Sequence, residues 1–146
     1  MCQGRSRCRT DWISRSSVRV LVADDQSQFL RTARSVVERT SGFELVAEAS
    51  SGAEAIALAE SLRPDLLVID ITMPGIGGIE AARRIVSRHP GSLAVLVSSY
   101  AEEDLPPAAH SCGAVTYIHK QGFGTDRLRN VWGRRPTARR GTTPRP

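Results

Sequence analysis

The stretch LLVIDITMPGIGG, residues 66–78, combines a short apolar run with a segment rich in proline and glycine. Its first four residues are apolar, which is typical of a short strand buried on both faces, and the run ends on Asp70. Pro74 then restricts Met73 to extended backbone. Three glycines allow a turn into a helix without crowding the strand end: Gly75, Gly77 and Gly78. The stretch therefore predicts a buried strand that carries one carboxylate to its end.

The same change of pattern recurs along the chain. Short apolar runs typical of strands occupy 18–23, 43–49, 65–70, 93–99 and 114–120. Segments with helical spacing of apolar residues, or in helix positions between the strands, occupy 27–42, 51–64, 78–91, 102–113 and 124–132. Five strands that alternate with five helices predict an α/β fold, with a parallel sheet and helices on both faces. In such sheets ligands bind at the carboxyl ends of the strands.

Length and composition limit the classes of protein. The chain has 146 residues, 40% of them hydrophobic, which is enough for one domain with a real core. It has no apolar run of the ~20 residues that a membrane span needs, and its N-terminus has no apolar core of a secretory signal, so we expect a cytoplasmic protein without membrane contact. The three cysteines form no C-x-x-C pair, which argues against a disulfide framework or a zinc site.

The net charge of +5 arises from the two ends of the chain. Residues 1–17 hold four Arg and one Asp, and residues 133–146 hold five Arg and no acid. Residues 18–132 therefore carry 11 basic and 14 acidic residues. We divide the chain into an N-terminal extension, a domain and an Arg/Pro-rich tail at these boundaries. The Arg-rich ends can contact nucleic acid, but a solvated flank is the interpretation that we favour.

Acidic and hydrogen-bonding side chains stand at the ends of the predicted strands. The first strand is followed by Asp24 and Asp25, the third ends in Asp70, the fourth in Ser98, and the fifth in Lys120. Of the 20 Lys and Arg residues, Lys120 is the only lysine, and a compact ammonium suits a single phosphoryl oxygen. All of these side chains are expected at one edge of the sheet. Each of these residues alone is weak evidence for a functional site, but their joint placement at the strand ends is strong evidence.

These residues predict a metal-assisted phosphoryl site. Crowded carboxylates repel one another unless a cation joins them, and Mg²⁺ prefers oxygen ligands. Asp70 is then placed to act as a nucleophile toward a phosphoryl group, while Lys120 neutralises charge on the transferring oxygens and the Ser98 hydroxyl holds another oxygen. A phosphatase that uses an aspartyl-phosphate is disfavoured, because Thr72 stands where a second acid is needed.

With these site residues, residues 18–128 resemble the receiver domain of two-component response regulators, most closely receivers of the LuxR/NarL type. The motifs that carry the resemblance are VADDQ (22–26), VIDITMPGIGGIEAARRI (68–85), VLVSSYAEED (95–104) and GAVTYIHKQGF (113–123). The resemblance implies a flavodoxin-like, doubly wound (βα)5 fold with strand order 2-1-3-4-5. It also implies a partner sensor histidine kinase, whose phosphohistidine donates the phosphoryl group, and a downstream protein whose identity is unknown.

The resemblance also assigns roles to single residues. Asp70 is implied to be the phospho-acceptor, and the Mg²⁺ ligands are implied to be Asp25, Asp70 and the backbone carbonyl of Thr72, with Asp24 acting through water. Ser98 matches the switch hydroxyl, Lys120 the lysine of the family, and Tyr117 the switch aromatic. From its own position, Tyr117 is equally an ordinary half-buried strand aromatic. The implied activity is self-catalysed phosphoryl transfer and autodephosphorylation, with no separate enzymatic reaction.

Two features depart from the family's pattern. Pro106 and Pro107 are expected to shorten the fourth helix, which we place from about Leu105, and the fifth helix is short as well. In this family those elements form the output and dimer face, so that face is expected to be altered. The residues printed after 132 are fewer than the roughly 50 to 60 that a DNA-binding helix-turn-helix needs. We therefore expect a stand-alone receiver, a monomer or a phosphorylation-dependent dimer; the alternatives are a truncated LuxR/NarL-type regulator or a nucleic-acid-binding protein.

Overall fold

A computed structural model of the chain describes residues 17–133. Its strands form one parallel sheet of five strands in the order β2-β1-β3-β4-β5. The strand bounds are β1 Val18–Ala23, β2 Phe43–Ala49, β3 Leu66–Asp70, β4 Leu93–Ser98 and β5 Thr116–His119. The predicted flavodoxin-like architecture and strand order are confirmed. The predicted N-terminal extension and Arg/Pro-rich tail lie outside the described residues, except for Ser17 and Gly133.

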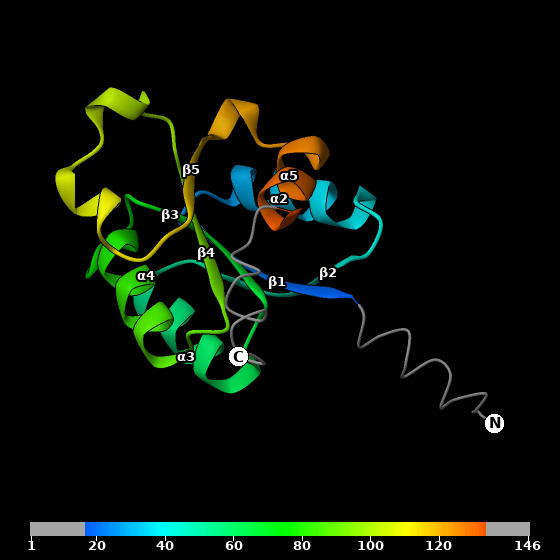
Figure 1. Cartoon of the computed structure of the whole chain (residues 1–146), viewed down its shortest axis with the longest axis horizontal. Helices are drawn as coiled ribbons and strands as arrows, with labels where there is room; N and C mark the ends of the chain where they lie inside the picture. Colours follow the sequence, from blue (N-terminus) through cyan, green and yellow to red (C-terminus); the bar gives the residue numbers. More distant parts are fainter. Residues whose placement is uncertain (1–16, 134–146) are drawn as a thin grey trace, which may run out of the picture.

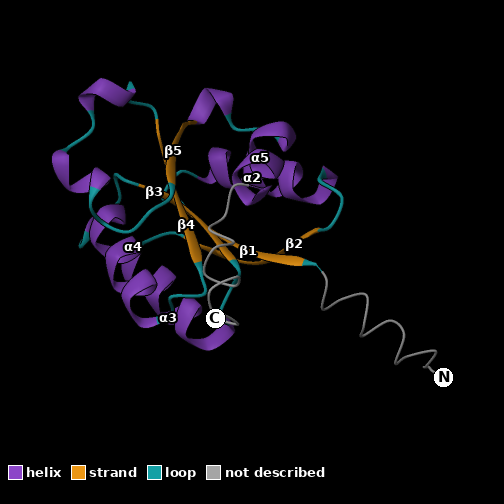
Figure 2. Ribbon diagram, in the orientation of Figure 1, coloured by secondary structure: helices purple, strands orange, loops and turns teal. Residues whose placement is uncertain are grey.

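Four α-helices cover the two faces of the sheet (Figures 1 and 2). They are α2 Ser27–Arg39, α3 Gly52–Leu62, α4 Gly77–Arg88 and α5 Thr125–Gly133. Helices α2 and α5 lie together on one face, and α3 and α4 lie together on the other. Among the helices of residues 17–133, none is both long enough and apolar enough to cross a bilayer.

The inner strands β1, β3 and β4 bury side chains on both faces in alternation, whereas the edge strands β2 and β5 are mostly half-buried. In β1, Val20 and Val22 belong to the core under α2 and α5, whereas Leu21 and Ala23 belong to the core under α3 and α4. Strand β3 alternates in the same way, and every one of its residues is buried. Such double burial explains why these strands read as continuous apolar runs in the sequence.

Prolines prevent the fourth predicted helix. The sequence predicted a helix within 102–113, starting near Leu105, but the structure has only two single 3₁₀ turns there, Glu102–Asp104 and Pro107–His110. Leu105 and Pro106 between them are extended. The residue before a proline is driven out of the helical region, so two consecutive prolines break the segment twice. The prediction of a short α-helix was therefore wrong.

Other element ends differ from the prediction by a few residues. Helix α2 ends at Arg39 rather than near Gly42, because the Thr40 hydroxyl donates to the carbonyl oxygen of Val36 at 2.6 Å and Thr40 itself is extended. Strand β5 is shorter than predicted and ends at His119, where a 3₁₀ turn begins at Lys120.

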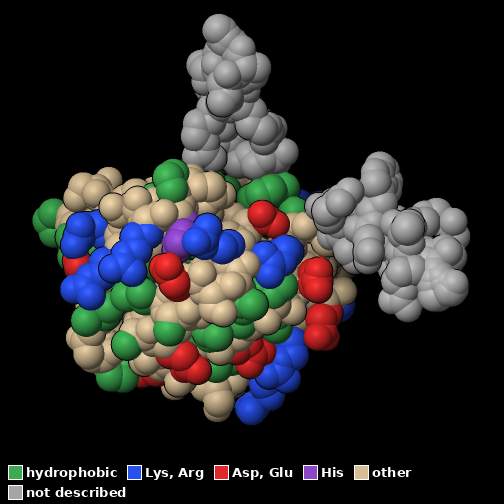
Figure 3. Space-filling model, turned by 90° about the horizontal axis from the view of Figure 1, so that it is seen from below, with side chains coloured by type: hydrophobic (Ala, Val, Ile, Leu, Met, Phe, Trp, Pro, Cys, Tyr) green, Lys and Arg blue, Asp and Glu red, His purple; other side chains and the backbone are tan. Residues whose placement is uncertain are grey.

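Acidic and basic side chains are interspersed on the face of the domain drawn in Figure 3. Several of the described arginines pair with glutamates on the helices, such as Arg84 with Glu80 at 2.7 Å and Arg88 with Glu60 at 3.6 Å. The face in Figure 3 therefore shows no broad patch of charge of a single sign, in keeping with the small net charge of residues 18–132.

Candidate functional site

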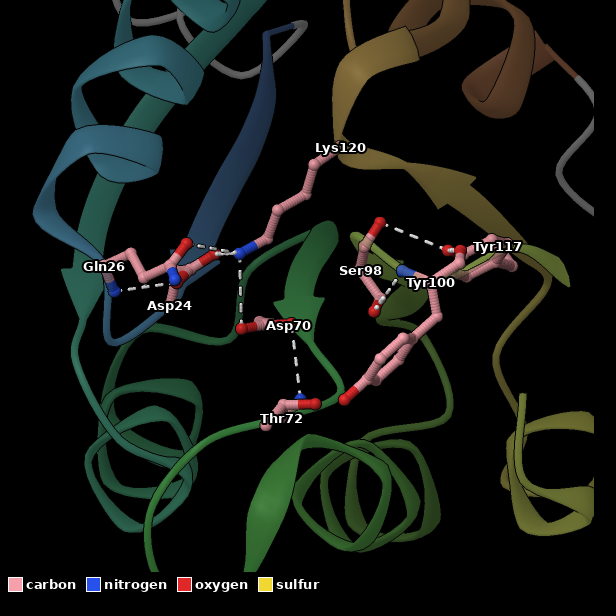
Figure 4. A network of polar contacts seen from close by, with 8 residues as sticks. All are labelled: Asp24, Gln26, Asp70, Thr72, Ser98, Tyr100, Tyr117 and Lys120. Carbon is pink, nitrogen blue, oxygen red and sulfur yellow. Dashed lines mark hydrogen bonds and ion pairs between the residues drawn. The ribbon is translucent and has the colours of Figure 1, made fainter. Parts of the chain in front are cut away.

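The carboxyl ends of four strands bring the predicted site residues together (Figure 4). Asp24 follows β1 directly, Asp70 and Ser98 are the last residues of β3 and β4, and Lys120 follows β5. They meet because parallel strands end at the same edge of a sheet. A hollow at this edge is lined by Asp25, Gln26, Asp70, Thr72, Ser98, Ser99, Tyr100 and Lys120.

Three carboxylates form an acidic cluster at this edge. Asp24, Asp25 and Asp70 each have a carboxylate oxygen within 4.8 Å of the others. Asp24 is fully buried and Asp70 is 4% exposed, whereas Asp25 is exposed. The Asp24 Oδ1 accepts the backbone N–H of Gln26 at 2.8 Å. Its Oδ2 is buried and forms an ion pair with Lys120, but among the described residues no donor is aligned to hydrogen-bond to it.

Lys120 supplies the positive charge of the site. Its Nζ lies 2.7 Å from Asp24 Oδ2 as an ion pair, 3.1 Å from Gln26 Oε1 and 3.4 Å from Asp70 Oδ2. It also lies 5.0 Å from the centroid of the Phe29 ring, where the negative ring face favours a cation. The side chain is only 11% exposed, so these contacts fix the ammonium between β1 and β3.

The environment of Asp70 favours its neutral form. Burial raises the pKa of the Asp70 carboxyl above its usual value, and the neighbouring charge of Asp24 raises it further. The backbone N–H of Thr72, 3.3 Å from Oδ1, and the ammonium of Lys120 oppose this shift. A carboxylate that is harder to ionise is a stronger nucleophile once it has lost its proton.

The donor set fits a hard divalent cation. Such ions prefer carboxylate oxygens, and the cluster offers three carboxylates, of which Asp24 has a buried oxygen that accepts no hydrogen bond and Asp25 is exposed on the hollow. A cation among them would offset the repulsion that raises the pKa of Asp70. The cluster can therefore bind a metal. Thr72 lines the same hollow, and the role of its carbonyl as a ligand stays a prediction.

Ser98 and Tyr117 are linked through the backbone after β4 (Figure 4). Ser98 is 2% exposed, and its Oγ accepts the N–H of Tyr100 at 3.1 Å. The hydroxyl of Tyr117 donates to the carbonyl oxygens of Ser98, at 3.1 Å, and of Tyr100. Burial raises the pKa of the Tyr117 phenol, which keeps it a proton donor. Tyr117 is half-buried and tied to the strand that carries Ser98; its role as a switch stays a prediction.

The glycines after Asp70 are required for two different structural reasons, a left-handed backbone and a close approach to β3. Gly75 and Gly77 adopt φ of 81° and 78°, the left-handed region that glycine tolerates. Gly78 lies against the end of β3, and a Cβ on it would lie 2.6 Å from the Asp70 carbonyl carbon and 2.9 Å from Ile71 Cα. The expectation that these glycines allow the turn without crowding the site is confirmed.

Sequence reasoning missed two residues of the site. Gln26 was part of a matching motif but had no assigned role, and Phe29 lay within the predicted helix 27–42 without a role at the site. Both approach Lys120 across more than 90 residues of chain, which no local pattern reveals. The one available signal was a glutamine in the position before a helix, where shorter polar residues are preferred.

Known proteins resemble the chain in sequence and structure. A sequence profile of the response regulator receiver domain matches residues 20–131. The response regulator GacA of Pseudomonas viridiflava is 35% identical over 103 residues, which are 70% of this chain and 48% of GacA. The chemotaxis protein CheY of Listeria monocytogenes is 33% identical over 111 residues, which are 76% of this chain and 92% of CheY.

A solved structure agrees with these matches. A LuxR-family two-component response regulator from Aurantimonas sp. SI85-9A1 superposes with a TM-score of 0.73 at 30% identity, over 82% of this chain and 89% of that one. Several of the curated relatives are longer proteins, and the chain spans about half the length of GacA.

Proposed function

Because the chain belongs to the response regulator receiver domain family, we propose that it is a phosphorylation-dependent signalling module in which Asp70 accepts a phosphoryl group from a sensor histidine kinase. The observation that carries the proposal is the contact of Lys120 with both Asp24 and Asp70 at the edge of a hollow. A nucleophile, a buried acid and a lysine from three strands there meet the needs of phosphoryl transfer.

The proposed step uses the carboxylate of Asp70 as the nucleophile. An oxygen of Asp70 bonds to phosphorus while the bond from phosphorus to the donor's imidazole nitrogen breaks. The electron pair of that bond stays on the imidazole, and Asp70 becomes an acyl phosphate. Lys120 offsets the negative charge that the transferred group brings, roughly −1.5 to −2 at neutral pH. Water reverses the modification later, and we propose no separate substrate or enzymatic reaction.

We propose Mg²⁺ as the cation of the acidic cluster. Asp25, Asp70 and the Thr72 carbonyl would hold it directly and Asp24 through water, and Asp25 and Thr72 line the hollow from which an ion enters. When bound, Mg²⁺ supplies positive charge that offsets the carboxylates and the phosphoryl oxygens.

The proposed readout begins at Ser98 and Tyr117. A phosphoryl group on Asp70 offers Ser98 a stronger acceptor than its present surroundings. A movement of Ser98 would disturb the carbonyl oxygens to which the Tyr117 hydroxyl donates. The segment that follows β4 lacks an α-helix, so the surface offered to a downstream protein, or to a second copy of the domain, would differ from that of relatives with a helix there. We place the domain in the cytoplasm, where kinases draw on ATP.

Phosphorylation of the purified protein tests the proposal. Incubation with acetyl phosphate and Mg²⁺ is expected to add the mass of one phosphoryl group, and chelation of the metal is expected to prevent the gain. Asp70→Asn is expected to abolish it, whereas the matched control Asp104→Asn, an exposed acid outside the site, is expected to retain it. Failure of the wild-type protein to gain mass with acetyl phosphate and with a panel of histidine kinases would refute the proposal.

A further inference from the structure

Gln26 occupies the N-cap position of α2 but does not cap the helix. Its backbone is extended, with φ −100° and ψ 113°, and its side chain makes no capping hydrogen bond. N-cap positions favour Ser, Thr, Asp and Asn, whose short side chains reach the free N–H groups of the first turn. The Gln26 Oε1 instead accepts a hydrogen bond from Lys120 Nζ at 3.1 Å. Helix capping therefore does not explain a glutamine at this position.

The Lys120 ammonium is surrounded by three side-chain oxygens within 3.4 Å of Nζ (Figure 4). It donates hydrogen bonds to Gln26 and Asp70 and forms an ion pair with Asp24. The two shorter contacts, to Asp24 and Gln26, lie on the β1 side, and the longest is to Asp70 on β3. A phosphoryl oxygen on Asp70 must therefore draw the ammonium away from the β1 side.

The two β1-side contacts differ in how readily they can be given up. Asp24 is fully buried, and its Oδ2 forms an ion pair with Lys120 and accepts no hydrogen bond, so losing Lys120 would leave an uncompensated buried charge. Gln26 is neutral and exposed, and water can replace Lys120 at its amide oxygen. Gln26 is the partner that the ammonium releases at the smaller cost.

We infer that Gln26 is a positioning residue, which holds Lys120 toward β1 and competes with a phosphoryl group on Asp70 for one N–H of the ammonium. The inference rests on the proposed function, because it concerns the phosphorylated form of Asp70. Gln26 thereby lowers the affinity of the site for a phosphoryl group and sets how readily the domain becomes phosphorylated.

The variant Gln26→Ser tests this role, because serine can cap α2 but is too short to reach Lys120. The probe is the trifluoroberyllate anion, a phosphoryl mimic, titrated with Mg²⁺ and followed by fluorine NMR. Loss of one hydrogen bond from the free form is expected to lower the dissociation constant roughly three- to tenfold. The matched control Gln28→Ser changes an exposed glutamine of the same helix, and its dissociation constant is expected to equal that of the wild type.

A second measurement separates positioning from a general effect on the helix. Lys120 is the only lysine of the chain, so lysine labelled with carbon-13 gives a single Cε signal. Gln26→Ser is expected to move the signal of the free protein toward its position in the trifluoroberyllate complex, and Gln28→Ser is expected to leave it in place. In a Lys120→Ala background, the effect of Gln26→Ser on probe affinity is expected to vanish.

The outcomes separate the two proposals. A wild-type protein that binds no trifluoroberyllate and gains no phosphoryl group refutes the proposed function. A wild-type protein that binds the probe, with Gln26→Ser within twofold of it or with an unmoved Cε signal, refutes only the role of Gln26. An effect of Gln26→Ser that persists without Lys120 also refutes it.

Discussion

Gly78→Ala is the substitution that most directly tests how the site is built. The N-terminal end of α4 passes so close to the end of β3 that a Cβ at residue 78 would overlap the carbonyl oxygen of Asp70 and lie 2.6 Å from its carbonyl carbon and 2.9 Å from Ile71 Cα. Non-bonded carbon atoms are comfortable at about 3.5–4.0 Å. The backbone of Asp70 or the start of α4 must therefore move by at least about 1 Å. All three contacts are with backbone, which cannot swing aside.

The expected cost follows from two opposing effects. Alanine in place of glycine favours a helix by about 1 kcal/mol. Overpacking against a rigid neighbour costs about 1–3 kcal/mol and occasionally more, and three backbone contacts place this site at the upper end. We expect a net loss of about 2 kcal/mol, which is a fall in Tm of about 8 °C for a domain of this size. A shift of about 1 Å in Asp70 is expected to slow phosphorylation by about 100-fold.

Thermal unfolding by circular dichroism and the initial rate of phosphorylation by acetyl phosphate measure the two effects. Gly91→Ala is the matched control, because a Cβ there meets nothing within 4 Å, and its Tm and rate are expected to stay close to wild type. A Gly78→Ala protein whose Tm and rate both equal those of Gly91→Ala would show that α4 does not press on Asp70, and would refute this account of the site.

Three further outcomes are expected. Burial and the charge of Asp24 raise the pKa of Asp70, so ionising Asp70 destabilises the fold at pH values above its unfolded pKa of about 3.9. Asp70→Asn is therefore expected to raise the Tm at pH 7 in the presence of chelator, and this gain is expected to shrink toward pH 3. An equal gain in Tm at both pH values would contradict this. Arg63 ends α3 with φ 50°, so Arg63→Gly is expected to stabilise the protein by about 0.5 kcal/mol in urea unfolding, where a loss of stability would argue against strain at this residue. Tyr117→Phe removes the hydroxyl that donates to the carbonyl of Ser98; we expect a loss of about 1 kcal/mol and faster amide hydrogen exchange at Tyr100, and unchanged exchange there would show that the hydroxyl does not restrain the loop.

The order of elements and the acids of the site could be predicted because their signals are local. Each strand is a short apolar run, each helix has its own apolar spacing, and the end of a strand can be read within a residue or two. Asp24 and Asp70 follow from this directly, since all strands of a parallel sheet end at the same edge. The missing helix after β4 is a partial failure of the same reasoning. Pro106 and Pro107 predicted a shorter helix, but propensity alone did not show that only 3₁₀ turns would remain.

The sequence by itself determined which residues reach the rim of the sheet, because strand length and alternation depend on neighbours a few positions apart. Only the tertiary structure decided how they touch. It placed Lys120 nearer to Asp24 and Gln26 than to Asp70, put the Phe29 ring beside the ammonium, and set α4 against the carbonyl of Asp70 at Gly78. The physical reason is that these contacts depend on strand order, register and helix placement to within about 1 Å, and residues as far apart as 26 and 120 share no local pattern that carries such detail.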